Sequence, residues 1–227
     1  MNIAIIGTGY VGLVSGACLS EFGHEVICID KDASKVETLK AGGIPIYEPG
    51  LDEVVAVNSK AGRLSFTTDL KSAVAGAQAV FIAVGTPSRR GDGHADLSYV
   101  YAAAEEIAKA AAPNAVVVNK STVPVGTAEM VRRMLGREDV HVVSNPEFLR
   151  QGTAVHDFLH PSRVVIGGSD SKAMERVAAL YEGVDAPILR MNTASAEALK
   201  YAANAFLATK LTFINAMADI CEAVGAD

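Results

Sequence analysis

Two polar side chains near the end of the chain are spaced so that both could act on one oxygen atom. Lys200 and Asn204 lie four residues apart in a segment with helical periodicity, so they project from one face of the helix. An ammonium group beside a carboxamide can hold a hydroxyl or stabilise a developing oxyanion. The residues alone allow a second interpretation equally well, in which Lys200 is a solvated lysine and Asn204 a hydrogen-bonded core amide.

A carboxylate and a hydroxyl follow two short apolar segments that have the composition of buried strands. Glu147 comes after residues 140–144, and Thr122 comes after residues 115–119 and directly before Val123. If both segments belong to a parallel sheet, both side chains lie at its carboxyl edge, where ligands bind. The alternatives are a glutamate favoured at a helix start by the helix dipole and a threonine that caps a turn.

The first thirty residues contain a glycine-rich turn between an apolar strand and a helix. Gly7 allows a tight turn, Gly9 allows backbone to approach a pyrophosphate, and Gly12 allows the helix to pack on the sheet. Asp30 ends the next strand, about 20 residues on, where a carboxylate can accept from a ribose hydroxyl. This pattern predicts a dinucleotide site, and because Asp30 would repel a 2'-phosphate, the cofactor is expected to be NAD. The turn residues expected to bind it are Gly7, Gly9, Tyr10, Val11 and Gly12.

The elements that position these residues alternate along the chain. β-Branched segments predict strands at about 2–6, 25–30, 79–84, 115–119, 140–144, 163–167 and 187–189. Helices are predicted at 11–22, 32–41, 51–59, 97–111, 127–135 and 171–182. This alternation predicts an α/β fold, a Rossmann-like doubly wound and mostly parallel sheet, as the NAD-binding domain over residues 1–193.

A change of pattern predicts one long helix from about 194 to 225, which begins a second region at 194–227. Its apolar arc is wider than one sheet can cover, so we expect it to pack against a second subunit, a further domain, or both. A homodimer through the 194–225 helix is therefore expected. We also expect the chain to be the amino-terminal part of a longer protein, without its second nucleotide-sugar domain.

Composition excludes several classes of function. The chain has 227 residues, a net charge of −6 and no block of Lys or Arg, so neither nucleic acid nor a membrane is an expected partner. No apolar run predicts a signal peptide or a membrane span. Cys18, Cys28 and Cys221 form no CxxC pair and indicate thiols in a reducing cytoplasm. The histidines show no metal-ligand spacing, so no metal is expected.

Six short motifs occur in order along almost the whole chain. They are GTGYVG at 7–12, IYEPGL at 46–51, GTP at 85–87, STVPVG at 121–126, NPEFL at 145–149 and KYAANAFL at 200–207. Together they resemble the amino-terminal half of the UDP-glucose/GDP-mannose dehydrogenase family. The resemblance implies oxidation of a sugar C6 alcohol to an acid with two NAD, through a thioester on a cysteine of a second domain. No matching cysteine segment occurs here, so this chain alone is expected to be inactive.

The resemblance also implies roles for particular residues. The candidate catalytic residues are Thr122, Glu147, Lys200 and Asn204, of which Lys200 and Asn204 hold the alcohol and oxyanion and Glu147 activates water. Further cofactor contacts are implied for Lys35, Gly85, Thr86, Thr122 and Gln151. Substrate contacts are implied for Glu147, Phe148, Leu149, Arg150, Gln151, Lys200 and Asn204. Many relatives have a glutamate where this chain has Gln151, and an amide can bind there but cannot act as a base.

Two other classes of function remain as alternatives. One is a β-hydroxyacid-type dehydrogenase, because such enzymes also join a nucleotide domain to long helices with a Lys and an Asn at this spacing. The other is a non-catalytic NAD-binding or dimerisation module. YEPGL, STVPVG and NPEF favour the sugar-nucleotide family, and the resemblance makes a UDP-sugar, UDP-glucose above all, the expected substrate. Its oxidised product would suit polysaccharide precursor synthesis.

Overall fold

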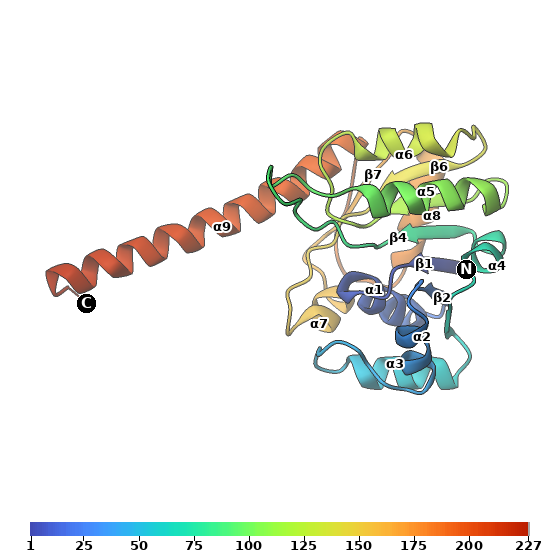
Figure 1. Ribbon diagram of the computed structural model, residues 1–227, viewed down its shortest axis with the longest axis horizontal. Coiled ribbons are helices and arrows are strands. Elements are labelled where there is room, and N and C mark those ends of the chain that lie inside the picture. The colour runs from blue at the N-terminus through green and yellow to red at the C-terminus, as the bar shows by residue number, and fades with distance from the viewer. Residues whose placement is uncertain (227) are drawn as a thin grey trace.

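Eight strands form one sheet within residues 1–226, the part of the chain that this computed structural model describes (Figure 1). The strands are β1 (Asn2–Ile6), β2 (Glu25–Ile29), β3 (Leu64–Thr67), β4 (Ala79–Ile82), β5 (Val116–Asn119), β6 (His141–Ser144), β7 (Val164–Gly167) and β8 (Ile188–Met191). Their order is β3-β2-β1-β4-β5-β6-β7-β8. All neighbours are parallel except β6 and β7, which are antiparallel and meet at Ser144 and Gly167. The predicted doubly wound, mostly parallel fold is confirmed.

Helices cover both faces of the sheet (Figure 1). They are α1 (Tyr10–Glu21), α2 (Ala33–Lys40), α3 (Leu51–Lys60), α4 (Leu70–Ala75), α5 (Ser98–Ala110), α6 (Thr127–Leu135), α7 (Ala154–Leu159), α8 (Ser171–Ala178) and α9 (Thr193–Val224). One core joins α1, α2, α3, α7 and α8 to the sheet, and the other joins α4, α5 and α6 to its opposite face. Strands β4, β5 and β7 are buried throughout, which explains their continuous apolar sequences.

Three short elements were not predicted from the sequence, and one helix was predicted to be longer than it is. β3, α4 and α7 are only four to six residues long, too short to show a period. The helix predicted at 171–182 ends at Ala178, and a 3-10 turn follows at Ala179–Tyr181. That turn buries Leu180 and Tyr181 in the core.

The topology brings distant segments to one edge of the sheet. Because β1, β2, β4, β5 and β6 are parallel, their carboxyl ends lie together. The chain order reverses between β1 and β4, and a crevice forms at such a switch point. The residues that follow these strands therefore line one region of the molecule.

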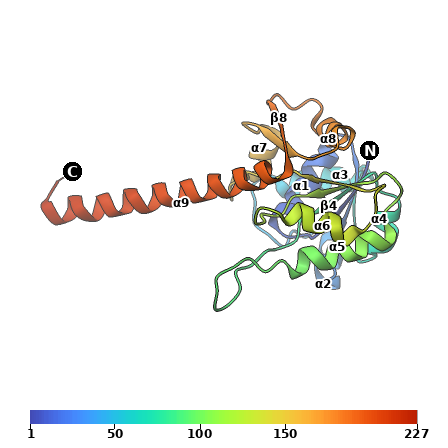
Figure 2. The same cartoon turned by 90° about the horizontal axis from the view of Figure 1, so that it is seen from above.

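The long helix α9 is attached to the domain only by its first turns. Ala196, Glu197 and Lys200 are its buried residues. Ala196 packs on Gly167, where an added Cβ would come within 2.5 Å of the Ala196 Cβ. From residue 201 onward the helix projects away from the sheet, as two perpendicular views agree (Figures 1 and 2). Among residues 1–226, no helix has the length and apolarity needed to cross a membrane.

Candidate functional site

The glycine-rich turn has the geometry that a pyrophosphate requires. Gly7 has φ +104°, and a Cβ there would lie 2.5 Å from the carbonyl oxygen of Ala83. A Cβ on Gly12 would overlap the Gly7 carbonyl, so Gly12 closes the turn itself as well as packing near the sheet. A Cβ on Gly9 would meet no atom within 4 Å, so the backbone faces open space at the start of α1. A ligand can approach that backbone closely.

Asp30 is held in place by the turn that it faces. Its Oδ2 accepts hydrogen bonds from the backbone N of Thr8 at 3.0 Å and the Thr8 hydroxyl at 2.6 Å, and its Oδ1 accepts from the N of Asp32 at 3.0 Å. Burial raises the pKa of Asp30, but these hydrogen bonds and the charge of Lys35 outweigh burial and lower it overall. The carboxylate is therefore ionised and fixed. Thr8, one of the three variable positions of the glycine motif, was not predicted as a functional residue from the sequence.

A cavity of about 740 Å³ opens at the switch point beside these residues. Its lining includes Gly7, Gly9, Asp30, Lys35, Gly85, Thr86, Tyr99 and Glu106. The Thr86 hydroxyl donates to the carbonyl oxygen of Thr122 at 2.9 Å, so the ends of β4 and β5 meet there. The cavity is large enough for an extended dinucleotide ligand.

Val11 packs against the apolar core, and Gln151 is exposed on a different loop outside this lining.

Glu147 and Lys200 converge although 53 positions separate them in the sequence. The Lys200 Nζ lies 3.0 Å from Glu147 Oε1, and the two side chains are only 8% and 11% exposed. The same Nζ lies 5.2 Å from the centre of the Phe148 ring. Lys200 is thus a buried cation with a carboxylate and an aromatic face beside it, and the solvated-lysine interpretation is wrong.

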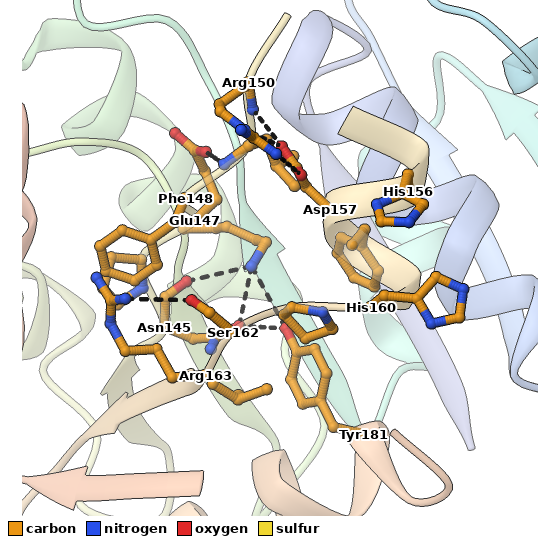
Figure 3. Close-up of a pocket in the computed structure, with 16 residues that line it drawn as sticks. Asn145, Glu147, Phe148, Arg150, His156, Asp157, His160, Ser162, Arg163 and Tyr181 are labelled. Carbon is orange, nitrogen blue, oxygen red and sulfur yellow. Dashed lines mark hydrogen bonds and ion pairs between the residues drawn. The ribbon is translucent and has the colours of Figure 1, made fainter. Parts of the chain in front are cut away.

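The other residues that were expected to contact the substrate or take part in catalysis lie around this pair. Asn204 is exposed one helical turn beyond Lys200, so it is not a core amide. Thr122 is half-buried after β5. Arg150 is exposed and paired to Asp157 at 2.7 Å, which directs its guanidinium away from Glu147 (Figure 3). The Leu149 backbone N donates to Glu147 Oε2 at 2.6 Å and fixes the second carboxylate oxygen.

A second cavity, of about 370 Å³, lies beside Glu147 and contains a lysine that the sequence analysis missed. Lys120 follows β5, is 3% exposed, and donates to Asn145 Oδ1 at 3.1 Å and the Tyr181 hydroxyl at 3.3 Å. Tyr181 donates to the same Asn145 oxygen at 2.6 Å (Figure 3). Burial lowers the pKa of Lys120 to about 8, although the Glu147 charge acts in the opposite direction. A lysine that directly extends an apolar strand is the signal that could have found it.

No group of three or more His, Cys, Asp or Glu residues within 1–226 is arranged to hold a metal ion. Cys18 and Cys28 are buried, and burial raises the pKa of both thiols to about 12, so they stay protonated. Cys221 lies on the projecting part of α9, remote from the carboxyl edge of the sheet.

The fold and the site together define an NAD-binding domain of the dehydrogenase class. The defining features are the doubly wound sheet, the glycine turn with its opposing carboxylate, and the buried Lys–Glu pair at the same sheet edge. Two family models cover the chain. The NAD binding domain of the UDP-glucose/GDP-mannose dehydrogenase family matches residues 1–185, and the central domain of that family matches residues 194–227. The chain belongs to the UDP-glucose/GDP-mannose dehydrogenase family.

Individual relatives agree with the family match. The chain is 58% identical to a UDP-glucose 6-dehydrogenase of Rhizobium meliloti and 52% identical to UDP-glucose 6-dehydrogenase TuaD of Bacillus subtilis. Both alignments cover 100% of this chain. It covers 54% and 50% of those proteins, so it spans about half the length of the relatives it matches.

Solved structures give the same result. A GDP-mannose dehydrogenase from Pseudomonas aeruginosa superposes with a TM-score of 0.95 at 40% identity, covering 100% of this chain and 54% of that one. A UDP-glucose dehydrogenase from Pyrobaculum islandicum has a TM-score of 0.95 at 44% identity, covering 99% and 54%. A 3-hydroxyisobutyrate dehydrogenase from Mycobacterium tuberculosis is only 20% identical, with a TM-score of 0.70, which is a likeness of fold alone. The β-hydroxyacid alternative therefore lacks support beyond the fold.

Proposed function

We propose that this chain is the NAD-binding half of a UDP-glucose 6-dehydrogenase, which oxidises the sugar C6 alcohol to the acid of UDP-glucuronate. The observation that carries the proposal is the 3.0 Å pair of Glu147 and Lys200 at the sheet edge where the cofactor crevice opens. The names of the closely similar relatives support UDP-glucose as the substrate. When bound, NAD would supply a hydride acceptor beside the sugar carbon.

The chain's own residues would bind the alcohol and stabilise charge on its oxygen. The Lys200 ammonium lies beside Glu147, and it would donate to a hydroxyl or an alkoxide at C6. Asn204, one turn further, offers a second donor from the same helix. Glu147 would hold Lys200 in position during oxidation and accept a proton from water during hydrolysis of the thioester.

Other residues near these groups would contact the substrate and the cofactor. Phe148, Leu149 and Gln151 follow Glu147 on the same loop, and the Phe148 ring packs under the Arg163 guanidinium at 4.5 Å. An aromatic ring fixed in this way offers an apolar surface to a sugar. Thr122, Thr86 and Gly85 would contact the nicotinamide end of NAD, while Asp30 and Lys35 would contact the adenosine ribose.

The first experiment measures cofactor binding by the 227-residue chain with isothermal titration calorimetry. We expect NAD to bind with clear preference over NADP, and Asp30→Ala to weaken NAD binding about tenfold and reduce the preference, because a ribose acceptor and its charge are removed. Asp52→Ala, an exposed carboxylate at the start of α3, serves as the matched control. Equal binding of NAD and NADP by the unchanged chain would contradict the cofactor assignment.

A second experiment tests the reaction with protein expressed from the complete reading frame that contains these residues. UDP-glucose should reduce two NAD per sugar, and Lys200→Met should lower kcat by at least about a hundredfold, because loss of an oxyanion donor costs this much. If the protein instead reduced NAD with a β-hydroxyacid as substrate and turned over no UDP-sugar, the result would support the alternative class.

We also infer that the chain self-associates through α9 and works in the cytoplasm. The helix exposes Phe206, Leu211, Phe213 and Ile214 by more than half of their surfaces, a contiguous apolar face that a second copy could cover. Unpaired cysteine thiols at positions 18, 28 and 221 support a reducing compartment. A non-catalytic NAD-binding dimer would share these features, and the turnover assay separates the two functions.

A further inference from the structure

The YEPGL motif contains a buried carboxylate that neither the cofactor crevice nor the Glu147–Lys200 pair explains. Glu48 lies in an irregular segment between α2 and α3 and is 5% exposed, whereas its neighbour Tyr47 is 85% exposed. A buried glutamate is costly unless several donors satisfy it. The partners of Glu48 therefore indicate what the motif does.

Glu48 is bound by three donors from parts of the chain remote in sequence. Its Oε1 accepts from the backbone N of Ala154, and its Oε2 accepts from the backbone N of Gly152 and the hydroxyl of Tyr10, each at 2.8 Å. Burial raises the pKa of Glu48, but the hydrogen bonds that it accepts, with those from Gly152 and Tyr10 foremost, together outweigh burial and lower the pKa overall. Burial and the adjacent charge raise the pKa of Tyr10, so its hydroxyl remains a donor.

Tyr10 extends the connection into the cofactor turn. It is the first residue of α1, directly after Gly9, whose backbone faces the crevice. Its hydroxyl also approaches the carbonyl oxygen of Arg150 at 3.1 Å. One side chain of the glycine motif thus contacts both the YEPGL carboxylate and the loop that follows β6.

That loop carries the proposed catalytic carboxylate. Residues 145–153 contain no helix or strand, and Glu147 lies near their start. Lys200 holds the loop at Glu147, and Glu48 holds its far end at Gly152 and at Ala154, the first residue of α7. Thr153, which precedes α7, makes no capping hydrogen bond with its own side chain, so Glu48 supplies the acceptor there.

We propose that Glu48 and Tyr10 are positioning residues, which fix the Glu147 loop to the NAD-binding turn and couple cofactor binding to the order of that loop. This inference rests on the proposed function. NAD bound at Gly9 would stabilise the start of α1 against local opening, and the Tyr10 hydroxyl would pass that stabilisation to Glu48 and Arg150. The loop in turn would hold Tyr10 in place before the cofactor arrives.

The test is hydrogen–deuterium exchange with mass spectrometry on the 227-residue chain. Tyr10→Phe removes one hydroxyl, Glu48→Gln removes the charge and one acceptor, and Tyr47→Phe is the matched control beside Glu48. Without cofactor, we expect exchange in peptides spanning 150–155 to accelerate at least about fivefold in both variants and not in the control. Glu48→Gln removes one of the two oxygens that accept from the Gly152 and Ala154 amides, and Tyr10→Phe removes the hydroxyl that holds the Glu48 carboxylate and the Arg150 carbonyl in place. Amides of β5 report whether each variant remains folded.

Saturating NAD then tests the coupling. In the unchanged chain, NAD should slow exchange in peptides spanning 147–155, and Tyr10→Phe should bind NAD while losing most of this response. An equal NAD response in Tyr10→Phe would overturn the coupling, and unchanged exchange in both variants without cofactor would overturn the positioning role. Failure of the unchanged chain to bind NAD would count against the proposed function, whereas the cofactor-free comparison would still decide the positioning role.

Discussion

Lys200 is stabilised by its contacts with Glu147 and Phe148, and this arrangement makes the pair sensitive to loss of either partner. Glu147→Gln keeps the shape of the side chain but leaves a buried ammonium without a counterion. We expect the free energy of unfolding to fall by about 3 kcal/mol, because breaking a buried pair from one side strands the other charge. Urea denaturation of the chain measures this change.

An exposed ion pair provides the comparison. Glu37→Gln removes the partner of Lys40 in a pair whose side chains are 71% and 51% exposed, and it should leave stability nearly unchanged. If the two substitutions cost the same, the buried position of Lys200 would have no energetic meaning and its role as a fixed donor would lose support.

Lys120 gives the molecule a pH-dependent stability at the same edge of the sheet. Burial lowers its pKa from 10.5 to about 8 in the folded chain. Between these values the unfolded chain binds more protons, so this group makes the free energy of unfolding rise as pH increases from about 8 to about 10.5. Lys120→Met should remove that rise.

The measurement is urea denaturation of both proteins at several pH values between about 7.5 and 10.5. Tyrosine and cysteine side chains also titrate in this range, so the quantity that matters is the difference between the unchanged chain and Lys120→Met. A difference that stays constant across the range would show that Lys120 has an ordinary pKa in the folded protein.

At the scale of elements, a carboxylate from α9 determines where the projecting helix leaves the domain. Glu197 accepts from the backbone N of Gly126 and of Ala128, each at 2.7 Å, at the start of α6. Gly126 has no side chain to cap that helix, so Glu197 supplies the acceptor from 69 to 71 positions away.

Glu197→Ala should therefore loosen α9 as well as destabilise the fold. The backbone amides of Gly126 and of the buried Ala128 lose their acceptor, so we expect the free energy of unfolding to fall by about 2 kcal/mol. Hydrogen exchange of the first turns of α9 should accelerate in the same variant. Glu222→Ala, an exposed glutamate on the same helix, is the control and should change neither quantity. Unaltered exchange in α9 would mean that apolar packing of Ala196 alone anchors the helix.

The contacts of the carboxylates Glu48 and Glu197 could not be predicted from the sequence. The cofactor turn and all strands except β3 were predictable because their signals are local: β-branched runs, a glycine spacing, and Asp30 directly after β2. Glu48 and Glu197 bind backbone amides more than 60 positions away, and no local pattern encodes those contacts. Glu147 and Lys200 were predicted as separate residues, but their direct pairing appears only when the loop after β6 meets α9.

At the scale of the whole molecule, α9 presents an apolar face that one copy of this domain leaves uncovered. Phe206, Phe213, Ile214 and Ile220 are 72%, 59%, 54% and 52% exposed, and their spacing places them on one broad side of the helix. Full burial of such side chains contributes about 2 kcal/mol each. Two copies that pack these faces together would gain enough to form a stable dimer at micromolar concentrations.

Ile214→Glu places a charge in the middle of this face and should raise the dissociation constant of the dimer by about a hundredfold or more, because the charge would be buried without a partner. Thr212→Glu introduces the same charge on the opposite side of the helix and should leave association unchanged. Sedimentation equilibrium over a range of chain concentrations measures both constants. Since Ile214 is already exposed in one copy, neither variant should lose thermal stability as a monomer. A monomeric unchanged chain, or equal weakening by both variants, would direct the search for the partner of α9 to another domain rather than a second copy.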